Sequence, residues 1–303
     1  MKTISLALIF LAIVSCKTQN TQNSKVQETN EKRLSISTPP VITLLSETPN
    51  LAHAESVFYD PIYDRLYVSV QGEQEPGDGS IATLDLQGNV LDLTFTTGLD
   101  NPKGIAIKND AIYVSDVTKL VAIDRKSGKI KQEYSLGDEQ FLNDVAVDDQ
   151  GNVYVSDMRS SSIYRLSPNR VYARWMTSPL LENPNGLLAV NNQLYVAAWG
   201  LPSKVEGEKS SGRFLKVDPY SKKVTNITAS PQGNLDGVQL FDESHFLISD
   251  WSAGTIHKAS KDGGFEDFFT SEFSVGDILY IQDKQLMVLP LNRQNKVQIY
   301  SVR

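Results

Sequence analysis

Cysteine, histidine and tryptophan are the residue types in which this chain of 303 residues is poorest. It contains one cysteine and three histidines, which are His53, His245 and His257. A single cysteine excludes an intramolecular disulfide framework and a zinc site built from several thiolates. The three histidines also lack the close spacing of a histidine-based zinc site.

Positive charge is also scarce. The 29 Lys and Arg residues are outnumbered by 36 Asp and Glu, which leaves a net charge of −7. The first 35 residues carry five positive and two negative side chains, or +3, so the remainder carries −10. An acidic body repels a phosphate backbone, so we expect no nucleic-acid partner, although a cation would be tolerated. A hydrophobic content of 40% argues against wholesale disorder.

The chain begins with one short apolar run, Ile4–Val14, preceded by Lys2. Eleven residues are too few to span a bilayer but suit the apolar region of a signal peptide. The run leads into Ile-Val-Ser-Cys at 13–16, which resembles a bacterial lipobox, and that resemblance implies lipidation of Cys16. The alternatives are an ordinary secretory peptide with an incidental cysteine, or an uncleaved anchor.

The lipobox reading divides the chain into a signal peptide (1–15), a lipidated cysteine with a polar tether (16–40) and a folded body (41–303). Residues 17–34 are rich in Gln, Asn, Thr and Lys and lack apolar periodicity, as a flexible tether does. We therefore expect a protein of the bacterial cell envelope, on the periplasmic or cell-surface side. Its only membrane contact is expected to be the lipid anchor.

The body repeats one pattern six times. A short apolar strand introduced by small polar residues leads through a turn to a second strand, which often ends in Ser-Asp. NPKGIAI (101–107) followed by AIYVSD (111–116) is one example. The second-strand tyrosines Tyr113, Tyr154 and Tyr195 are spaced by 41 and 41 residues. A period near 40 with several strands in each unit is typical of a β-propeller.

Segments between the copies, such as 80–95, 119–134 and 213–228, read as strand, polar turn and strand, as the outer half of a blade requires. No stretch shows sustained helical periodicity, so almost no helix is expected. The apolar segment VITLLS (41–46) precedes the first copy and is expected to complete the last blade. The sequence therefore predicts an all-β fold, a six-bladed β-propeller closed by an N-terminal strand. An open β-solenoid is the less favoured alternative.

Aligning the six copies places one residue of each first strand at the mouth of the central channel. These residues are Glu55, Lys103, Asn143, Asn185, Asp236 and Gly276. The next position holds Ser56, Gly104, Asp144, Gly186, Gly237 and Asp277.

Two carboxylates and two amides thus converge on one small volume. Converging carboxylates raise each other's pKa unless a cation lies between them. Carboxylate and carbonyl oxygens, without thiolate or imidazole, are the ligands that Ca²⁺ prefers. The alternative is that Asn-Gly and Asp-Gly serve only as turn dipeptides, but this does not explain Glu55 in front of an apolar strand.

These motifs resemble the senescence-marker-protein/gluconolactonase/luciferin-regenerating-enzyme-like family of six-bladed propellers. The plan is also similar to that of paraoxonases and diisopropyl-fluorophosphatases. AESVFYDP (54–61) is similar to the opening Glu motif of the family, and LNDVAVDDQGNVYVSD (142–157) to its Asn-Asp motif. PNGL (184–187) is similar to its Asn-Gly motif and LDGV (235–238) to its Asp-Gly motif. The resemblance covers about residues 41–303.

The resemblance implies that Glu55, Asn185 and Asp236 bind Ca²⁺ or another divalent cation. It implies that Asn143 either binds the same cation or holds a metal-bound water or substrate. It makes Asp236 the candidate base or nucleophile, with Ca²⁺ polarising a carbonyl or phosphoryl oxygen. Gluconolactonase-like members often carry an arginine two residues before the Asn-Asp motif, where this chain has Phe141. Lys103 is a candidate replacement for that positive charge.

Paraoxonase-like lactonases use a histidine as base near their calcium. His53, two residues before Glu55 and expected on the same face of the strand, is therefore a third catalytic candidate. A structural role for it is the alternative.

Several aromatic and apolar residues are candidates for the wall of a pocket. Trp199 and Trp251 follow the second strands of two blades, and Tyr59, Phe141 and Met158 are further candidates. Core packing between blades is the other role open to such residues. The polar insert 201–213 is either a lid or a plain surface loop.

Two functions follow from these observations. The first is a calcium-dependent hydrolase of the lactonase or esterase type, acting on a small-molecule lactone or related ester. The second is a non-catalytic propeller of NHL type that binds a protein or glycan at the cell envelope.

Overall fold

The computed structural model describes residues 40–303 except Gln74. Three expectations concern earlier residues: the signal peptide, the lipidation of Cys16 and the tether up to residue 39. They lie outside the described residues.

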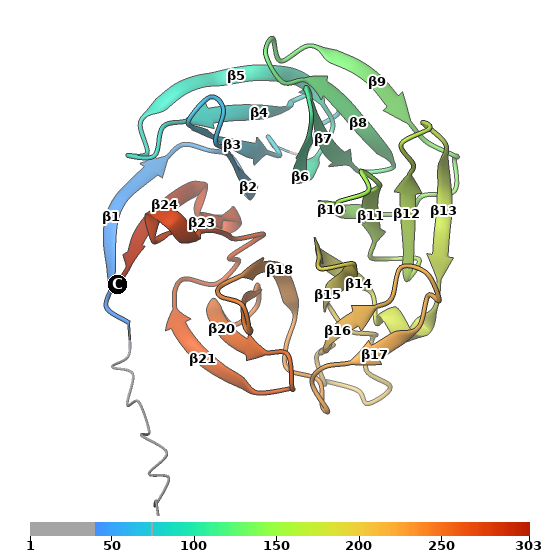
Figure 1. Cartoon of the computed structure of the whole chain (residues 1–303). Coiled ribbons are helices and arrows are strands. Elements are labelled where there is room, and N and C mark those ends of the chain that lie inside the picture. Colours follow the sequence, from blue (N-terminus) through green and yellow to red (C-terminus); the bar gives the residue numbers. More distant parts are fainter. Residues whose placement is uncertain (1–39, 74) are drawn as a thin grey trace, which may run out of the picture. The chain divides into compact units, whose positions relative to one another are not determined.

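The described chain folds into six antiparallel sheets of four strands each. Figure 1 shows the sheets arranged around a central axis as the blades of a propeller. Within blades one to five, the chain runs from the innermost strand to the outermost. The predicted all-β, six-bladed propeller is therefore confirmed.

The strands of the first three blades are β2 (Ala54–Asp60), β3 (Arg65–Val70), β4 (Gly79–Leu84) and β5 (Val90–Leu99); β6 (Pro102–Lys108), β7 (Ala111–Asp116), β8 (Lys119–Asp124) and β9 (Ile130–Tyr134); β10 (Leu142–Val147), β11 (Val153–Asp157), β12 (Ser162–Leu166) and β13 (Tyr172–Thr177). Those of the next two blades are β14 (Pro184–Val190), β15 (Gln193–Ala198), β16 (Phe214–Val217) and β17 (Val224–Asn226); β18 (Leu235–Leu240), β19 (His245–Asp250), β20 (Thr255–Ser260) and β21 (Phe265–Thr270).

The sixth blade contains strands from both ends of the described chain. Its strands are β22 (Leu279–Ile281), β23 (Leu286–Leu291), β24 (Lys296–Val302) and β1 (Ile42–Pro49). β1 is the outermost strand and pairs antiparallel with β24, from Ile42 opposite Val302 to Pro49 opposite Lys296. The Nζ atom of Lys296 also lies 2.9 Å from Oε2 of Glu47. The segment expected to complete the last blade therefore forms β1.

The turns inside the blades follow the polar residues that the sequence places there. In blade three, the Oδ1 atom of Asp148 accepts a hydrogen bond of 2.7 Å from the backbone of Asn152. Gly151, within the same turn, has a φ of +79°, which glycine adopts without strain. Such tight reversals let each short strand return directly beside its neighbour.

The hydrophobic core lies between the blades. Six clusters of buried side chains are present, and each joins two neighbouring blades. One example joins Tyr67 and Ile81 of blade one with Ile105, Ile112 and Val121 of blade two. Because both faces of the inner strands are covered in this way, the strands are rigidly held around the axis.

Helical structure in the described residues is limited to three single 3₁₀ turns. They are η1 (Pro179–Leu181), η2 (Gln282–Lys284) and η3 (Asn292–Gln294). No helix in this part of the chain is long and apolar enough to cross a membrane.

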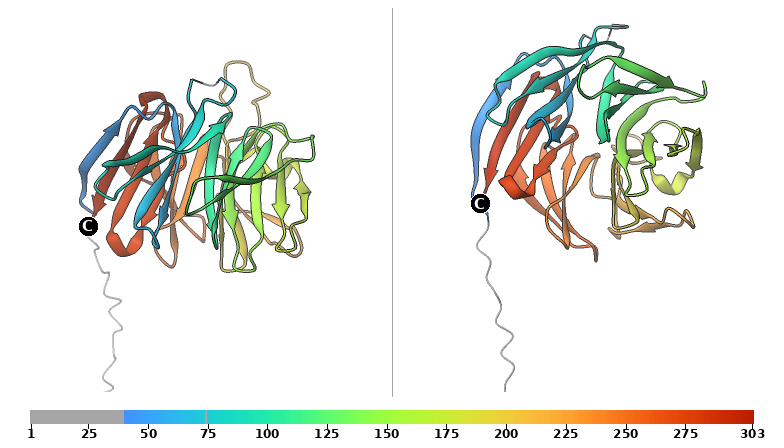
Figure 2. Two further views of the ribbon diagram at one scale, coloured as in Figure 1. Left: turned by 90° about the horizontal axis from the view of Figure 1, so that it is seen from above. Right: turned by 45° about the horizontal axis from the view of Figure 1, so that its top comes forward.

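The insert 201–213 follows β15 and is part of a long loop that ends at β16. Figure 2 shows this loop projecting beyond the ends of the strands. Its return is held by Asn234, whose Nδ2 donates to the carbonyl oxygens of Trp199 (3.0 Å) and Ser210 (2.9 Å).

Candidate active site

The first residues of the inner strands meet at one cavity on the axis. The cavity has a volume of about 200 Å³. The inner-strand residues that line it are Glu55 of β2, Lys103 of β6, Asn143 of β10, Asn185 of β14 and Asp236 of β18. The structure thus brings together five of the six residues that the alignment of the repeats placed at the mouth of the channel. The sixth, Gly276, has no side chain.

Local irregularities of the inner strands determine which way these side chains point. The pairing register shifts across the site residue in five blades, for example between Leu142 and Val145 in β10. Such a β-bulge redirects side chains that strict alternation would send to opposite faces. Asn143 consequently lines the cavity, while the next residue, Asp144, lines a second cavity further along the axis.

Buried serines at the ends of the second strands connect neighbouring blades beneath the site. The Oγ atom of Ser156 accepts a hydrogen bond of 2.8 Å from the N–H of Asp144 in its own blade. It donates one of 2.7 Å to the carbonyl oxygen of Asn185 in the next blade. Ser115 likewise donates to the carbonyl oxygen of Asn143. The serine of the repeated Ser-Asp pair therefore fixes the backbone of the site residues.

The aspartate of the same pair holds the loop that enters the inner strand. The carboxylate of Asp157 accepts hydrogen bonds from the N–H groups of Gln140 (2.8 Å) and Phe141 (3.1 Å). Asp116 accepts them from Asp100 (3.0 Å) and Asn101 (2.6 Å). These carboxylates are occupied by backbone donors, so their role is structural.

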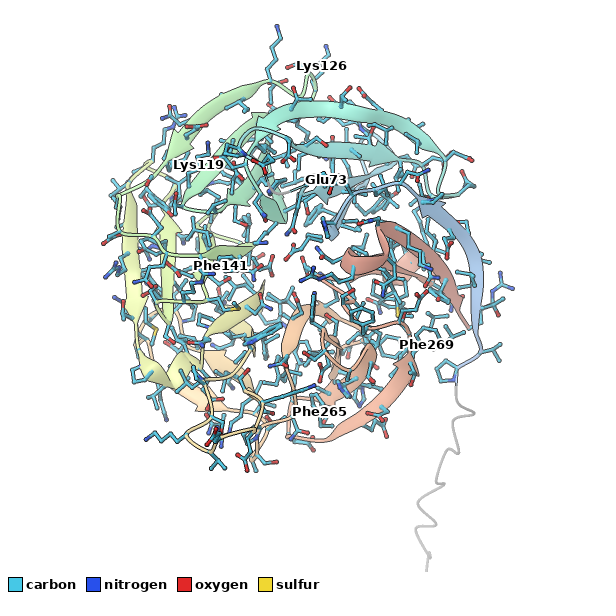
Figure 3. All side chains as sticks on the ribbon, turned by 180° about the vertical axis from the view of Figure 1, so that it is seen from behind. Glu73, Lys119, Lys126, Phe141, Phe265 and Phe269 are labelled. Carbon is cyan, nitrogen blue, oxygen red and sulfur yellow. The ribbon has the colours of Figure 1, made fainter. Side chains whose placement is uncertain are left out.

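The wall of the cavity comes mainly from one further repeat position, the residue directly after each second strand. Five of the six residues at this position line the cavity: Gln71, Met158, Trp199, Trp251 and Asn292. Phe141 and Arg293 complete the lining. Figure 3 shows Phe141 at the inner end of blade three, beside the axis.

The structure thus places four of the five predicted wall residues in the cavity. The exception is Tyr59, which lines a different cavity of about 610 Å³ with Ile62 and Tyr280. Gln71, Asn292 and Arg293 were not predicted from the sequence. The repeat position shared by Gln71, Asn292 and the two tryptophans was the signal that could have found the first two.

His53 does not take the position that strand alternation predicted. It precedes β2 and has a left-handed backbone with a φ of +52°, so it does not share a strand face with Glu55. Its Nδ1 atom lies 3.3 Å from Oδ1 of Asn292. The described residues that line the cavity do not include it. A left-handed residue reverses the direction of the side chain, which sequence periodicity cannot reveal.

The charged side chains of the site are almost completely buried. Glu55 and Asp236 are each 5% exposed and Lys103 is 6% exposed. Burial raises the pKa of Glu55 to about 7, although the positive charge of Lys103 opposes this shift. Burial also raises the pKa of Asp236 well above its ordinary value, and the charges of Glu55 and Asp277 add to the effect. Burial lowers the pKa of Lys103, although the negative charge of Glu55 opposes this shift.

Lys103 is held beside the carboxylates by two contacts. Its Nζ atom donates a hydrogen bond of 2.9 Å to Oδ1 of Asn101. The same atom lies 5.0 Å from the ring centre of Phe141, within range of a cation–π interaction. Its ammonium group therefore stands in the cavity with Glu55 and Asp236.

Two oxygen atoms of the predicted ligands lack partners. Oε2 of Glu55 and Oδ1 of Asn185 are buried and accept no hydrogen bond from the described residues. A buried acceptor without a partner is costly, and a bound cation would satisfy it. Two carboxylates and two amides supply only oxygen ligands, so this set fits Ca²⁺. No group of three His, Cys, Asp or Glu side chains suited to a metal exists in the described chain.

A second layer of carboxylates lies next along the axis. Asp144 accepts a hydrogen bond of 2.6 Å from the N–H of Leu187, and Asp277 accepts one of 2.7 Å from the hydroxyl of Ser56. Burial raises the pKa of Asp277 to about 7. Glycine is required between such neighbours, because a Cβ atom on Gly237 would lie 2.5 Å from Oδ1 of Asp277.

Comparison with known proteins shows similarity at the level of the fold. No family model and no curated protein sequence matches the chain. Among solved structures, a gluconolactonase from Xanthomonas campestris is 16% identical, with a TM-score of 0.65 over 88% of this chain and 96% of that one. A luciferin-regenerating enzyme is 14% identical, with a TM-score of 0.62 over 87% and 95% of the two chains.

A third similar structure is a catalytically inactive histidine-to-alanine form of virginiamycin B lyase from Staphylococcus aureus, with quinupristin. It is 11% identical, with a TM-score of 0.60 over 87% of this chain and 100% of that one. Gluconolactonase and luciferin-regenerating enzyme, two enzyme types of the family that the sequence motifs resemble, are thus among the solved structures that share this architecture. The described chain is a six-bladed β-propeller with the fold of these propeller enzymes.

Proposed function

We propose that the protein is a calcium-dependent hydrolase that opens a lactone or a related ester at the axial cavity. The observation that carries the proposal is the pair of unpartnered oxygens, Oε2 of Glu55 and Oδ1 of Asn185. They belong to a set of four oxygen-bearing residues, completed by Asn143 and Asp236, that lines one cavity. The sequence resemblance and the shared fold of a gluconolactonase and a luciferin-regenerating enzyme support the same assignment.

Glu55, Asn143, Asn185 and Asp236 would hold the metal. When bound, Ca²⁺ supplies a Lewis acid that polarises the carbonyl oxygen of the ester. The cavity's own residues do the remaining work. Trp199 and Trp251 hold the substrate and exclude water, which strengthens every electrostatic interaction inside.

Asp236 is the residue that we assign to proton transfer or nucleophilic attack. Its carboxylate lies in the cavity and takes a proton from the attacking water, or attacks the carbonyl carbon itself. In the first case the bond between the carbonyl carbon and the ester oxygen breaks, and the proton passes from Asp236 to the departing oxygen. In the second case the same bond breaks, water gives a proton to the departing oxygen, and its hydroxide releases the acyl group from Asp236 as the product acid. The ammonium of Lys103, which lines the same cavity, stabilises negative charge that develops on the substrate.

His53 has no role in this mechanism, because its ring contacts Asn292 and it does not line the cavity. The same observation argues against the chemistry of the virginiamycin B lyase. That protein is inactive when a histidine is replaced by alanine, and no histidine is among the described residues that line this cavity.

The test is turnover of a panel of lactones and aryl esters by the full-length protein, with Ca²⁺ and with chelator. We expect turnover that requires Ca²⁺. Binding of Ca²⁺ without turnover of any member would instead support the non-catalytic NHL-type propeller.

Amide variants separate the role of ligand from that of base. At saturating Ca²⁺, with occupancy followed by calorimetry, Glu55→Gln should recover most of its kcat. Asp236→Asn should still lose about 10²–10⁴-fold, the typical contribution of a general base. Full recovery of Asp236→Asn would make Asp236 a ligand only. His53→Gln is the matched control and should keep the wild-type kcat.

We also propose that the protein is a lipoprotein of the bacterial cell envelope, anchored through Cys16. The support is the short apolar run that ends before Cys16 and the polar composition of residues 17–34.

A further inference from the structure

Two arginines lack an acidic partner among the described residues, one of them lining the cavity and the other in contact with a residue of its wall. Arg293 lines the cavity, and its guanidinium carbon lies 5.9 Å from the ring centre of Trp251. The guanidinium carbon of the exposed Arg159 lies 4.7 Å from the ring centre of Phe141. Of the described arginines, three form ion pairs, namely Arg125, Arg174 and Arg213, and the others, with Arg159 and Arg293 among them, form none. The two arginines at the cavity are therefore free to meet an anion.

Blades three to five give the cavity an apolar side. Phe141, Met158, Trp199 and Trp251 line it, and the ring centres of the two tryptophans are 5.9 Å apart, with the rings tilted by 58°. Aromatic walls suit a planar ring, because ring pairs at 4.5–7 Å attract one another beyond the area that they bury.

Part of the hydrogen-bonding capacity on the side of blades six and one is used within the protein. The Nδ2 atom of Asn292 donates to the carbonyl oxygen of His53 (3.2 Å) and to Oε1 of Gln71 (3.3 Å). Arg293, which follows Asn292, is the positively charged group on this side of the cavity.

The residues that line the cavity carry two negative charges, on Glu55 and Asp236, and two positive ones, on Lys103 and Arg293. Asp144 and Asp277 add negative charge in the second cavity along the axis. The attraction for an anion therefore comes from Arg293 itself, and a bound divalent cation would add to it.

We propose that the substrate is a small planar ester or lactone that carries a carboxylate. Its ring packs against Trp199 and Trp251, and its carboxylate pairs with Arg293, whose guanidinium can donate two parallel hydrogen bonds. Arg159 attracts the anion from solution. A volume of about 200 Å³ limits the ligand to roughly one ring. The inference names the substrate class of the proposed hydrolase and so rests on that function.

The first test compares esters that differ in one charge. The full-length protein with Ca²⁺ is given 4-carboxyphenyl acetate and 4-carbamoylphenyl acetate, which have nearly the same size. We expect kcat/KM to favour the carboxylate by about tenfold or more, the factor expected for one charge-assisted pair. Arg293→Gln should bring the ratio close to one, and Arg293→Lys should keep part of it.

The matched control is Arg170→Gln. Arg170 lies in the turn between β12 and β13, away from the residues that line the cavity, so the same loss of charge should leave the ratio unchanged. Because exposed charges are screened by salt, a high concentration of NaCl should lower the wild-type ratio. A ratio near one in the wild type, or an equal loss in Arg170→Gln, would overturn the inference.

The second test measures binding without turnover. Calorimetry compares benzoate with benzamide on the wild type and Arg293→Gln, with Ca²⁺ and with chelator. A preference for benzoate that Arg293→Gln removes supports the inference. If no ester is hydrolysed in the same protein, only the proposed hydrolase activity is contradicted. Turnover without this preference leaves the hydrolase standing and overturns the inference. A preference that survives Arg293→Gln but disappears with chelator also overturns it, because the carboxylate then binds the metal.

Discussion

The hydroxyl of Ser156 links the inner strands of two neighbouring blades beneath the candidate site, and its removal tests how the site is held. Ser156 is completely buried, and its Oγ atom joins the N–H of Asp144 (2.8 Å) to the carbonyl oxygen of Asn185 (2.7 Å). Ser156→Ala removes both hydrogen bonds without adding volume. We expect a loss of stability together with a weaker affinity for Ca²⁺.

The size of the loss follows from these two groups. A buried backbone group left without a partner costs about 1–3 kcal/mol, so the pair should cost about 2–6 kcal/mol. This is a large part of the stability of about 5–15 kcal/mol that native proteins have. Because Asn185 also loses the group that positions its backbone, the affinity for Ca²⁺ should fall about 10–100-fold, as is typical for residues behind a metal ligand.

The assay is urea unfolding of the full-length protein, combined with calorimetric titration of the folded variant with Ca²⁺. Ser162→Ala is the matched control, because Ser162 is equally buried in the same blade but its hydroxyl bonds to Thr177 (2.8 Å) in the outer strands. It should lose about 1 kcal/mol of stability and keep the wild-type affinity. Ser156→Cys, which retains a weak donor, should fall between the wild type and Ser156→Ala.

Two results would refute this reasoning. A loss below about 1 kcal/mol in Ser156→Ala would show that the freed groups find other partners. Equal affinities for Ca²⁺ in Ser156→Ala and Ser162→Ala would show that the cross-blade hydrogen bonds do not position the ligands.

Three further predictions concern the closure of the ring, the N-terminus and a buried histidine. Removing residues 1–48 deletes most of β1 and exposes the edge of β24, so the melting temperature should fall sharply. Removing residues 1–38 keeps β1 and should leave the melting temperature unchanged. Equal melting temperatures for the two truncated proteins would contradict the role of β1 in closing the ring. Cys16→Ser should release the protein into the soluble fraction, whereas mass spectrometry that finds unmodified Cys16 in the mature wild type would refute lipidation. Burial lowers the pKa of His257, so the stability of the folded protein should fall as the pH drops below about 6.5, where the unfolded chain takes up the proton first. In thermal unfolding between pH 7 and pH 5, His257→Gln should reduce this fall in stability. An unchanged dependence on pH would exclude His257 as its cause.

The architecture could be predicted from the sequence because its signals are local and repeated. A turn dipeptide and an apolar strand depend on neighbouring residues, and the same pattern recurs six times, with a period of 41 residues between Tyr113, Tyr154 and Tyr195. Equivalent units around an axis place equivalent residues at the same height. This is why alignment alone could bring Glu55, Asn143, Asn185 and Asp236 together.

Only the tertiary structure decided how these residues are oriented and supported. His53 illustrates the limit, because its left-handed backbone takes its ring to Asn292, which is 239 residues distant in the chain. The hydrogen bond from Ser156 to Asn185 likewise crosses from one blade to the next. Such contacts depend on packing between blades, which no local pattern of residues encodes.

The sequence by itself thus determined the repeat, the strand order and the identity of the residues at the axis. The tertiary structure decided that Oε2 of Glu55 and Oδ1 of Asn185 are left without partners and that Arg293 stacks on Trp251. The physical reason is the range of the interactions. Periodicity and turn formation act between neighbours in the chain, whereas burial, hydrogen bonding and charge act between residues that only the closed ring brings into contact.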